Sequence, residues 1–226
     1  MTMADKGLIE YLSGFATSER VKRFREVLAN RTRYITVVLE ELYQEQNASA
    51  VLRTCDCFGI QDVHVIEGKN KFNVNDSIAM GSSKWLTVHK YKMTDLLLKD
   101  CISGLKAKNY RIVATVPDPN AIPLEKFDLL KGKTALMFGT ELNGLSEESK
   151  SYADEFLFIP MAGFTESFNI SVSAGIILSH LSRQLQISNI DWTLNDEEKD
   201  ELILNWLRES VRSSELLEAN YNMKRG

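Results

Sequence analysis

The spacing of apolar residues over the first part of the chain is that of amphipathic helices. Apolar side chains recur there at three- and four-residue steps, in two groups: Leu8, Ile9, Leu12 and Phe15, then Val21, Phe24, Val27 and Leu28. This spacing predicts one broken helix or two short helices. Because serine favours helix starts, we expect Ser18 to cap the second of them.

From Tyr34 onward, short β-rich runs alternate with stretches of helical periodicity. The runs predict strands at 35–39, 63–66, 85–91, 111–116, 134–138 and 156–159. The periodicity predicts helices at 48–58 and 174–185, a helix that Thr94 caps, a helix that starts at Ser146, and a last helix that opens at Asn195 with Glu198 three residues on.

Continuous apolar strands separated by helices favour a mostly parallel α/β sheet with helices on both faces. Such sheets place their ligand site in the loops beyond the carboxyl ends of the strands. The functional residues are therefore expected in the loops that follow Leu39, Val116, Phe138 and Ile159.

The composition is that of an ordinary globular protein, because 44% of the 226 residues are hydrophobic and 26% are charged. The longest apolar runs are far shorter than the roughly 20 residues that cross a bilayer, and the N-terminus lacks the pattern of a signal peptide. We therefore expect a cytoplasmic protein without a membrane partner. Cys55, Cys57 and Cys101 have no zinc or redox spacing, so we expect reduced thiols and no metal.

Charge is unevenly distributed along the chain. The net charge of −4 argues weakly against a nucleic-acid partner, since phosphates attract positive charge. The segment from Arg20 to Arg33, however, holds six basic residues against the single acidic Glu26. This segment is either an RNA contact or a solvated helix face.

Common nucleotide-binding signatures are missing, since there is no Walker-type glycine-lysine loop and no glycine-rich turn after the first strand. Three other segments are polar in ways that packing does not require. They read Asn47 with Arg53-Thr54 six residues later, then Gly139-x-Glu141-x-x-Gly144, and finally Pro160-Met161-x-Gly163-x-x-x-Ser167-x-Asn169-x-Ser171-x-Ser173. Each follows a predicted strand, so all three fall where a ligand site is expected.

These motifs, in this order, resemble those of the SPOUT superfamily of RNA 2′-O-ribose methyltransferases, TrmH type, over roughly residues 34–186. The resemblance implies a deep trefoil knot in the C-terminal half, with S-adenosylmethionine bent within its loops. It also implies a homodimer whose site lies near the subunit interface.

The resemblance assigns a catalytic set: Arg53, Asn47, Glu141, Ser167 and Asn169. Arg53 would engage the target ribose and phosphate and assist removal of the 2′-OH proton, as a literal base or electrostatically. Asn47 is also a plausible N-cap before Ala48. Glu141 would hold neighbouring amides or the substrate loop in place.

The resemblance also assigns a cofactor set: Thr115, Gly139, Ile159, Met161 and Phe168. Main-chain groups would hold most of the cofactor. The family usually has leucine where this chain has Phe168, which alters the expected shape of the adenine pocket. Because the sulfur loses its positive charge as the methyl group leaves, a neutral, amide-rich pocket is expected.

Three segments are expected: a basic helical extension at 1–33, a methyltransferase domain at 34–187 and a C-terminal helical extension at 188–226. Such short extensions resemble those of tRNA enzymes and favour tRNA as substrate, and the TrmH-type resemblance implies guanosine 18 as the modified nucleotide. RNA would be bound through basic side chains, namely Lys22, Arg23, Arg25, Arg31 and Arg33. Ribosomal RNA methylation, or a non-catalytic RNA-binding role on the same fold, are the alternatives.

Overall fold

The computed structural model describes residues 4–41, 44–68, 72–92 and 95–224. The chain divides into two compact units. The sheet unit is Arg33–Trp192, and the helical unit combines Met1–Thr32 with Thr193–Gly226. The expected N-terminal and C-terminal extensions therefore form one body, with boundaries at 32/33 and 192/193 instead of 33/34 and 187/188.

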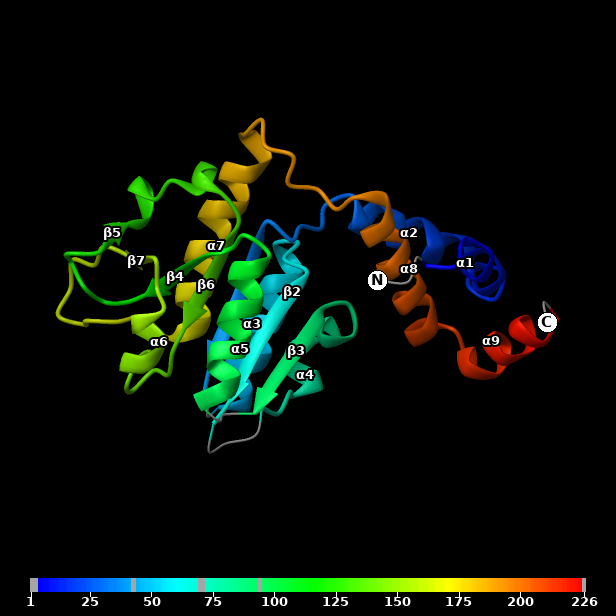
Figure 1. The fold of residues 1–226 in the computed structure, drawn as a ribbon, viewed down its shortest axis with the longest axis horizontal. Helices are drawn as coiled ribbons and strands as arrows, with labels where there is room; N and C mark the ends of the chain where they lie inside the picture. Colours follow the sequence, from blue (N-terminus) through cyan, green and yellow to red (C-terminus); the bar gives the residue numbers. More distant parts are fainter. Residues whose placement is uncertain (1–3, 42–43, 69–71, 93–94, 225–226) are drawn as a thin grey trace. The chain divides into compact units, whose positions relative to one another are not determined.

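The sheet unit contains a seven-stranded sheet in the order β3-β2-β1-β6-β4-β7-β5, and every described strand pair is parallel (Figure 1). The strands are β1 Ile35–Glu40, β2 Asp62–Glu67, β3 Thr87–Lys92, β4 Arg111–Thr115, β5 Ile122–Pro123, β6 Thr134–Phe138 and β7 Glu155–Phe158. The expected parallel α/β architecture is confirmed. The short strand β5 was not predicted from the sequence.

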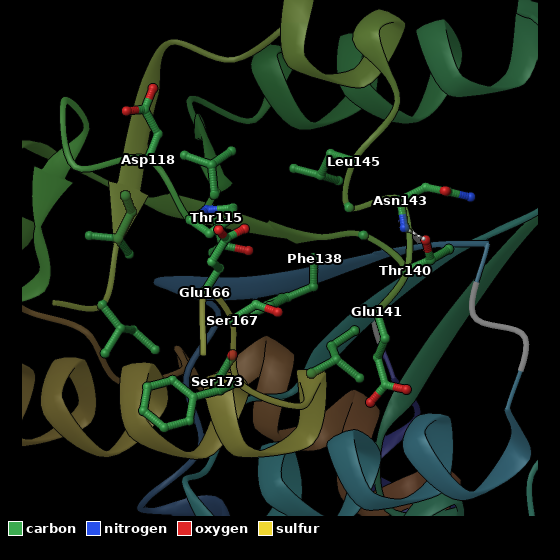
Figure 2. Close-up of a pocket in the computed structure, with 18 of the residues that line it drawn as sticks. Thr115, Asp118, Phe138, Thr140, Glu141, Asn143, Leu145, Glu166, Ser167 and Ser173 are labelled. Carbon is green, nitrogen blue, oxygen red and sulfur yellow. Dashed lines mark hydrogen bonds between the residues drawn. The ribbon is translucent and has the colours of Figure 1, made fainter. Parts of the chain in front are cut away.

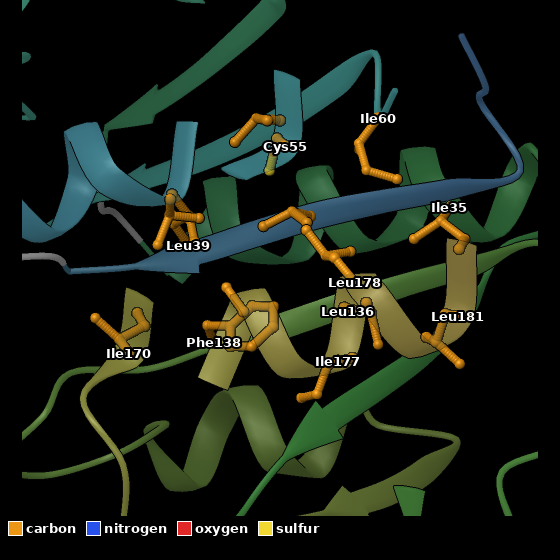
Figure 3. Packing of buried hydrophobic residues seen from close by; sticks show 14 of the residues in the cluster. Ile35, Leu39, Cys55, Ile60, Leu136, Phe138, Ile170, Ile177, Leu178 and Leu181 are labelled. Atoms are coloured by element: carbon orange, nitrogen blue, oxygen red, sulfur yellow. The ribbon is translucent and has the colours of Figure 1, made fainter. Parts of the chain in front are cut away.

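Helices cover both faces of this sheet, as expected. They are α3 Glu45–Cys57, α4 Asp76–Ala79, α5 Asp95–Ala107, α6 Glu147–Ser151 and α7 Ile170–Ile187. On one face, α3 and α7 pack on strands β1 and β6, and Figure 3 shows Ile177 and Leu178 beside Leu136 and Phe138. On the other face, α5 supplies a second cluster that includes Leu98 and Ile102. Each such buried side chain contributes roughly 1.5–3 kcal/mol of hydrophobic stabilisation.

Two helices begin earlier than their apolar spacing predicts, and both early starts carry motif residues. Helix α3 begins at Glu45 with Gln44 as N-cap, so Asn47 lies in its first turn and the expected N-cap role of Asn47 is wrong. Helix α7 begins at Ile170, and the side chain of Asn169 caps it by accepting from the Ser171 amide. Polar first turns carry little periodic signal, which explains the difference.

The helical unit consists of α1 Lys6–Ser13, α2 Ser18–Leu28, α8 Asp196–Ser210 and α9 Ser214–Met223. The expected pair of N-terminal helices and the capping box of Asn195 with Glu198 are confirmed. The N-cap of α2, however, is Thr17 and not Ser18. The two chain ends meet through aromatic rings, with the ring centroid of Phe24 in α2 lying 5.5 Å from that of Trp206 in α8.

Four further expectations concern the cap at Thr94, the trefoil knot, the start of β3 and the absence of a membrane span. The predicted cap at Thr94 lies outside the described residues, and the trefoil knot remains a prediction. The strand expected from residue 85 begins at Thr87, after a short 3-10 helix. Across the described part of the chain, no helix is both long and apolar enough to cross a membrane.

Candidate functional site

An open pocket of about 510 Å³ lies beyond the carboxyl ends of β4, β6 and β7 (Figure 2). Its walls come from three loops, with residues 115–118 after β4, 138–145 after β6, and 159, 161 and 166–168 after β7. Helix α7 closes one side with Ile170, Ser173 and Ile177. Three of the four loops named from the sequence thus meet at one place, as parallel topology requires.

The loop after β6 is a tight closed turn. Thr140 and Gly144 exchange main-chain hydrogen bonds of 3.0 and 2.9 Å, and the Thr140 hydroxyl accepts from the Asn143 amide. A Cβ atom at Gly139 would lie 2.1 Å from the carbonyl carbon of Gly144, while Gly144 itself has a φ of +66°. Both glycines of the second motif are therefore required by the backbone.

Asn169 joins the three motifs by hydrogen bonds. Its side-chain amide donates to Asn47 Oδ1 at 3.1 Å and to Glu141 Oε1, and its oxygen accepts from the Ser171 amide at 2.8 Å. Asn47 in turn donates to Gln44 Oε1 at 3.2 Å. Because donor and acceptor sides are both engaged, the orientation of the Asn169 amide is fixed.

The residues expected to hold the cofactor, Thr115, Gly139, Ile159, Met161 and Phe168, all line the pocket, together with Glu141 and Ser167. The Thr115 hydroxyl donates to the Met137 carbonyl at 2.8 Å and so ties β4 to β6. Phe168 is exposed, so its ring is open to a ligand.

Arg53 is separated from this group in the isolated chain. It is exposed on α3, and it is not among the residues that line the pocket. The structure thus brings Asn47, Glu141, Ser167 and Asn169 to the pocket or its edge, whereas a single chain leaves Arg53 outside.

Three of the pocket residues that the sequence reasoning did not name as site residues are charged. Asp118, Glu166 and Lys150 line the pocket, so the expected neutral, amide-rich lining is incomplete. Lys150 pairs with Glu147 at 2.8 Å, whereas Glu166 has no hydrogen-bond or ion-pair partner among the described residues. Both carboxylates stand in loops where functional residues were expected, Asp118 after Val116 and Glu166 after Ile159, so loop position alone could have indicated them.

The basic segment divides into an exposed and a buried part. Lys22, Arg23 and Arg25 are exposed on α2, as an RNA contact requires. Arg31, in contrast, is 1% exposed, and its guanidinium lies over the ring of Trp206. Arg33 forms a salt bridge with Asp62, with 2.9 Å between Arg33 Nε and Asp62 Oδ2. Arg31 and Arg33 thus make contacts inside their own units, and their contact with RNA stays a prediction.

Fold and site together define a parallel α/β protein with a small-ligand pocket built from three strand-end loops. The chain belongs to the SpoU rRNA Methylase family, whose model matches residues 34–179. It is 45% identical over 210 residues to the tRNA (guanosine(18)-2'-O)-methyltransferase of Borreliella burgdorferi, covering 93% of this chain and 94% of the relative.

Two solved structures have the same fold. The Aquifex aeolicus TrmH/SpoU tRNA modifying enzyme matches with a TM-score of 0.77 at 31% identity, over 86% of this chain and 98% of that one. An AdoMet-bound rRNA methyltransferase from Sinorhizobium meliloti matches with a TM-score of 0.60 over 73% of this chain and 61% of that one. The second likeness, at 23% identity, concerns the fold alone.

Proposed function

We propose that this chain is an S-adenosylmethionine-dependent RNA 2′-O-methyltransferase that modifies guanosine 18 of tRNA. The observation that carries the proposal is the hydrogen-bonded junction of Asn169, Asn47 and Glu141 at the edge of one pocket. Family membership and the tRNA activities named for the Borreliella burgdorferi and Aquifex aeolicus relatives support this substrate.

The pocket suits S-adenosylmethionine in size and in chemistry. Its volume of about 510 Å³ falls within the roughly 300–1,000 Å³ of small-ligand sites. Thr115, Gly139, Ile159 and Phe168 line it, and their main-chain groups would hold the cofactor while the Phe168 ring faces the adenine. When bound, the cofactor supplies the methyl group.

The side chains at the pocket edge would place the ribose. Asn169 is oriented before any ligand arrives, and Ser167 offers a hydroxyl beside it. Correct orientation of two reactants can lower a barrier by roughly 7 kcal/mol. Since arginine keeps its proton, the guanidinium of Arg53 would stabilise the negative charge that develops on the ribose O2′ as its proton leaves.

A homodimer is part of the proposal. Arg53 does not line the pocket of its own chain, and large apolar side chains near the pocket face solvent, with Leu142 90% and Phe164 108% exposed. A second copy that covers them would bring its own Arg53 toward this pocket. Mixing Arg53→Ala and Asn169→Asp chains would then restore activity that neither variant has, whereas no restoration would place both residues in one chain.

The test is transfer of labelled methyl groups to an unmodified tRNA transcript, followed by mapping of the modified ribose. We expect incorporation at guanosine 18, and a loss on the order of 10²-fold or more in Arg53→Ala with S-adenosylmethionine binding retained. Arg183→Ala, which removes another exposed arginine from the sheet unit, is the matched control and should retain activity.

The other outcomes separate the alternatives. Incorporation into ribosomal RNA fragments but not into tRNA would assign the enzyme to ribosomal RNA. Binding of S-adenosylmethionine without incorporation into any RNA would contradict the proposed activity and favour a non-catalytic RNA-binding role.

A further inference from the structure

Glu40, the last residue of β1, is a buried carboxylate held by one short segment of chain. It is 3% exposed. Its Oε2 accepts from the Ser146 amide at 2.9 Å, and its Oε1 accepts from the hydroxyls of Ser146 and Ser149 at 2.6 and 2.7 Å. Ser146 is the N-cap of α6, so all three donors belong to the start of that helix.

All three donors to Glu40 are neutral. Among the described residues, no cation pairs with this carboxylate. Removing a carboxylate from water costs several kcal/mol, so neutral hydrogen bonds at best offset its burial. What this arrangement does supply is geometry, because the carboxylate fixes the main chain at Ser146 relative to the end of β1.

The segment anchored at Ser146 is the one that lines the pocket after β6. All seven residues of 139–145 line the pocket, and they connect Phe138 of β6 to Ser146. Phe138 pairs in register with Leu39 of β1, and Ser146 is held by the next residue, Glu40. Both ends of this loop are therefore fixed by two adjacent residues of β1.

We propose that Glu40 is a positioning residue for the methyl donor, acting through the 139–145 loop without touching the ligand. This inference rests on the proposed function. With both ends fixed, the main chain at Gly139 is held ready for the cofactor, and Glu141 is held within reach of Asn169. Release of one end would let the loop move and would weaken cofactor binding before it weakened RNA binding.

The variants for the test are Glu40→Gln and Ser149→Ala. A glutamine of the same size offers a donor in place of one acceptor atom, so it cannot accept from all three groups. Ser149→Ala removes one hydroxyl and leaves the Ser146 cap in place. The matched control is Asp62→Asn, which alters a buried carboxylate at the amino end of β2, away from the strand ends that form the pocket.

The measurements are the Kd of S-adenosylhomocysteine by calorimetry, the KM of S-adenosylmethionine, the KM of tRNA, kcat, and the unfolding temperature. In Glu40→Gln we expect the Kd and the KM of the cofactor to rise about 10-fold, with a smaller fall in kcat because Glu141 lies on the same loop, while the KM of tRNA changes less than about 2-fold. Ser149→Ala should show a smaller rise in the same direction. Asp62→Asn should lower the unfolding temperature with an unchanged Kd.

A lowered unfolding temperature in Glu40→Gln, with Kd and KM as in the unaltered protein, would overturn the inference and leave Glu40 as a residue of stability only. An equal rise of Kd in Asp62→Asn would overturn it as well. Failure of the unaltered protein to bind either cofactor form would instead contradict the proposed function, so the two failures are distinguishable.

Discussion

The two units of this protein are built in opposite ways. The sheet unit is one continuous stretch, Arg33–Trp192, in which parallel strands deliver three loops to one pocket. The helical unit joins the two ends of the chain, and its helix α2 presents the exposed basic side chains Lys22, Arg23 and Arg25. Topology therefore places the candidate site in the sheet unit, whereas α2 of the helical unit presents a group of exposed basic side chains, which phosphates would attract.

The largest effect on activity is expected for a change at Asn169, because Asn169 lies at the candidate site of the sheet unit. Asn169→Asp keeps the oxygen that caps α7 but replaces the donor to Asn47 and Glu141 with a second carboxylate oxygen. We expect kcat to fall on the order of 10³-fold, since one misplaced polar group at a reacting centre has effects of this size. Steady-state methylation of tRNA measures it.

The control for this variant is Asn189→Ala, which alters an exposed asparagine beyond α7. The two variants should unfold at temperatures close to that of the unaltered chain, because the cap is preserved. If the kcat of Asn169→Asp stays within about tenfold of that of the unaltered protein, the hydrogen-bonded junction of the three motifs is structural and not catalytic.

The sequence predicted this region well where local pattern suffices. Strand β6 was predicted with its observed bounds, and Ser146 is the expected N-cap of α6. The start of α7 at Ile170 was not, because Ser171 and Ser173 in its first turn interrupt the apolar spacing. The burial of Glu40 could not be predicted either, since its donors lie more than 100 residues away in the chain.

His64 offers the next largest effect, on stability and not on catalysis. The pKa of His64 is lowered from 6.5 to about 4, mainly by burial in the sheet; His89 and Lys108 also lower it, and Asp62 opposes them. Below pH 6.5 the His64 ring binds a proton in the unfolded chain but stays neutral in the folded chain. Stability is thus fully present above pH 6.5 and falls by about 3 kcal/mol as the pH approaches 4.

Urea unfolding at pH 7 and pH 4.5 measures this fall, above the range in which Asp62, whose pKa is lowered, takes up a proton. His64→Gln should flatten the dependence, although it removes the 3.0 Å hydrogen bond between the His64 ring and the Tyr91 hydroxyl. An unchanged pH dependence in that variant would assign the titration to another group.

The contact between His64 and His89 could not be predicted from the sequence. The sequence places each of them in a predicted strand, but only the register of β2 and β3 stacks their rings, with the ring centroids 4.5 Å apart.

The helical unit shows the same limit at longer range. Periodicity predicted α1, α2 and the Asn195 capping box separately, because each is local. It gave no sign that Phe24 meets Trp206, or that Arg31 stacks on that ring. A basic run in sequence therefore overstated the basic surface, since two of its arginines serve packing and pairing.

The smallest effect is expected for the exposed charges on α2, which test whether the helical unit binds RNA. Replacing Lys22, Arg23 and Arg25 with glutamine removes three exposed charges from α2 and leaves buried Arg31 in place. We expect the KM of tRNA to rise about 10-fold with kcat unchanged at saturating RNA. The slope of log affinity against log salt should become shallower by about one for each phosphate that α2 no longer neutralises.

The matched control removes the same amount of charge from the sheet unit, by the exposed residues Lys99, Lys126 and Arg183. If both triple variants weaken tRNA binding equally, the effect is one of net charge, and α2 is no specific RNA-binding element. If only the α2 variant weakens it, and the salt slope falls with it, the helical unit retains RNA while the sheet unit transfers the methyl group. The Asn169→Asp chain should then bind tRNA with unchanged affinity, because its lesion lies in the other unit.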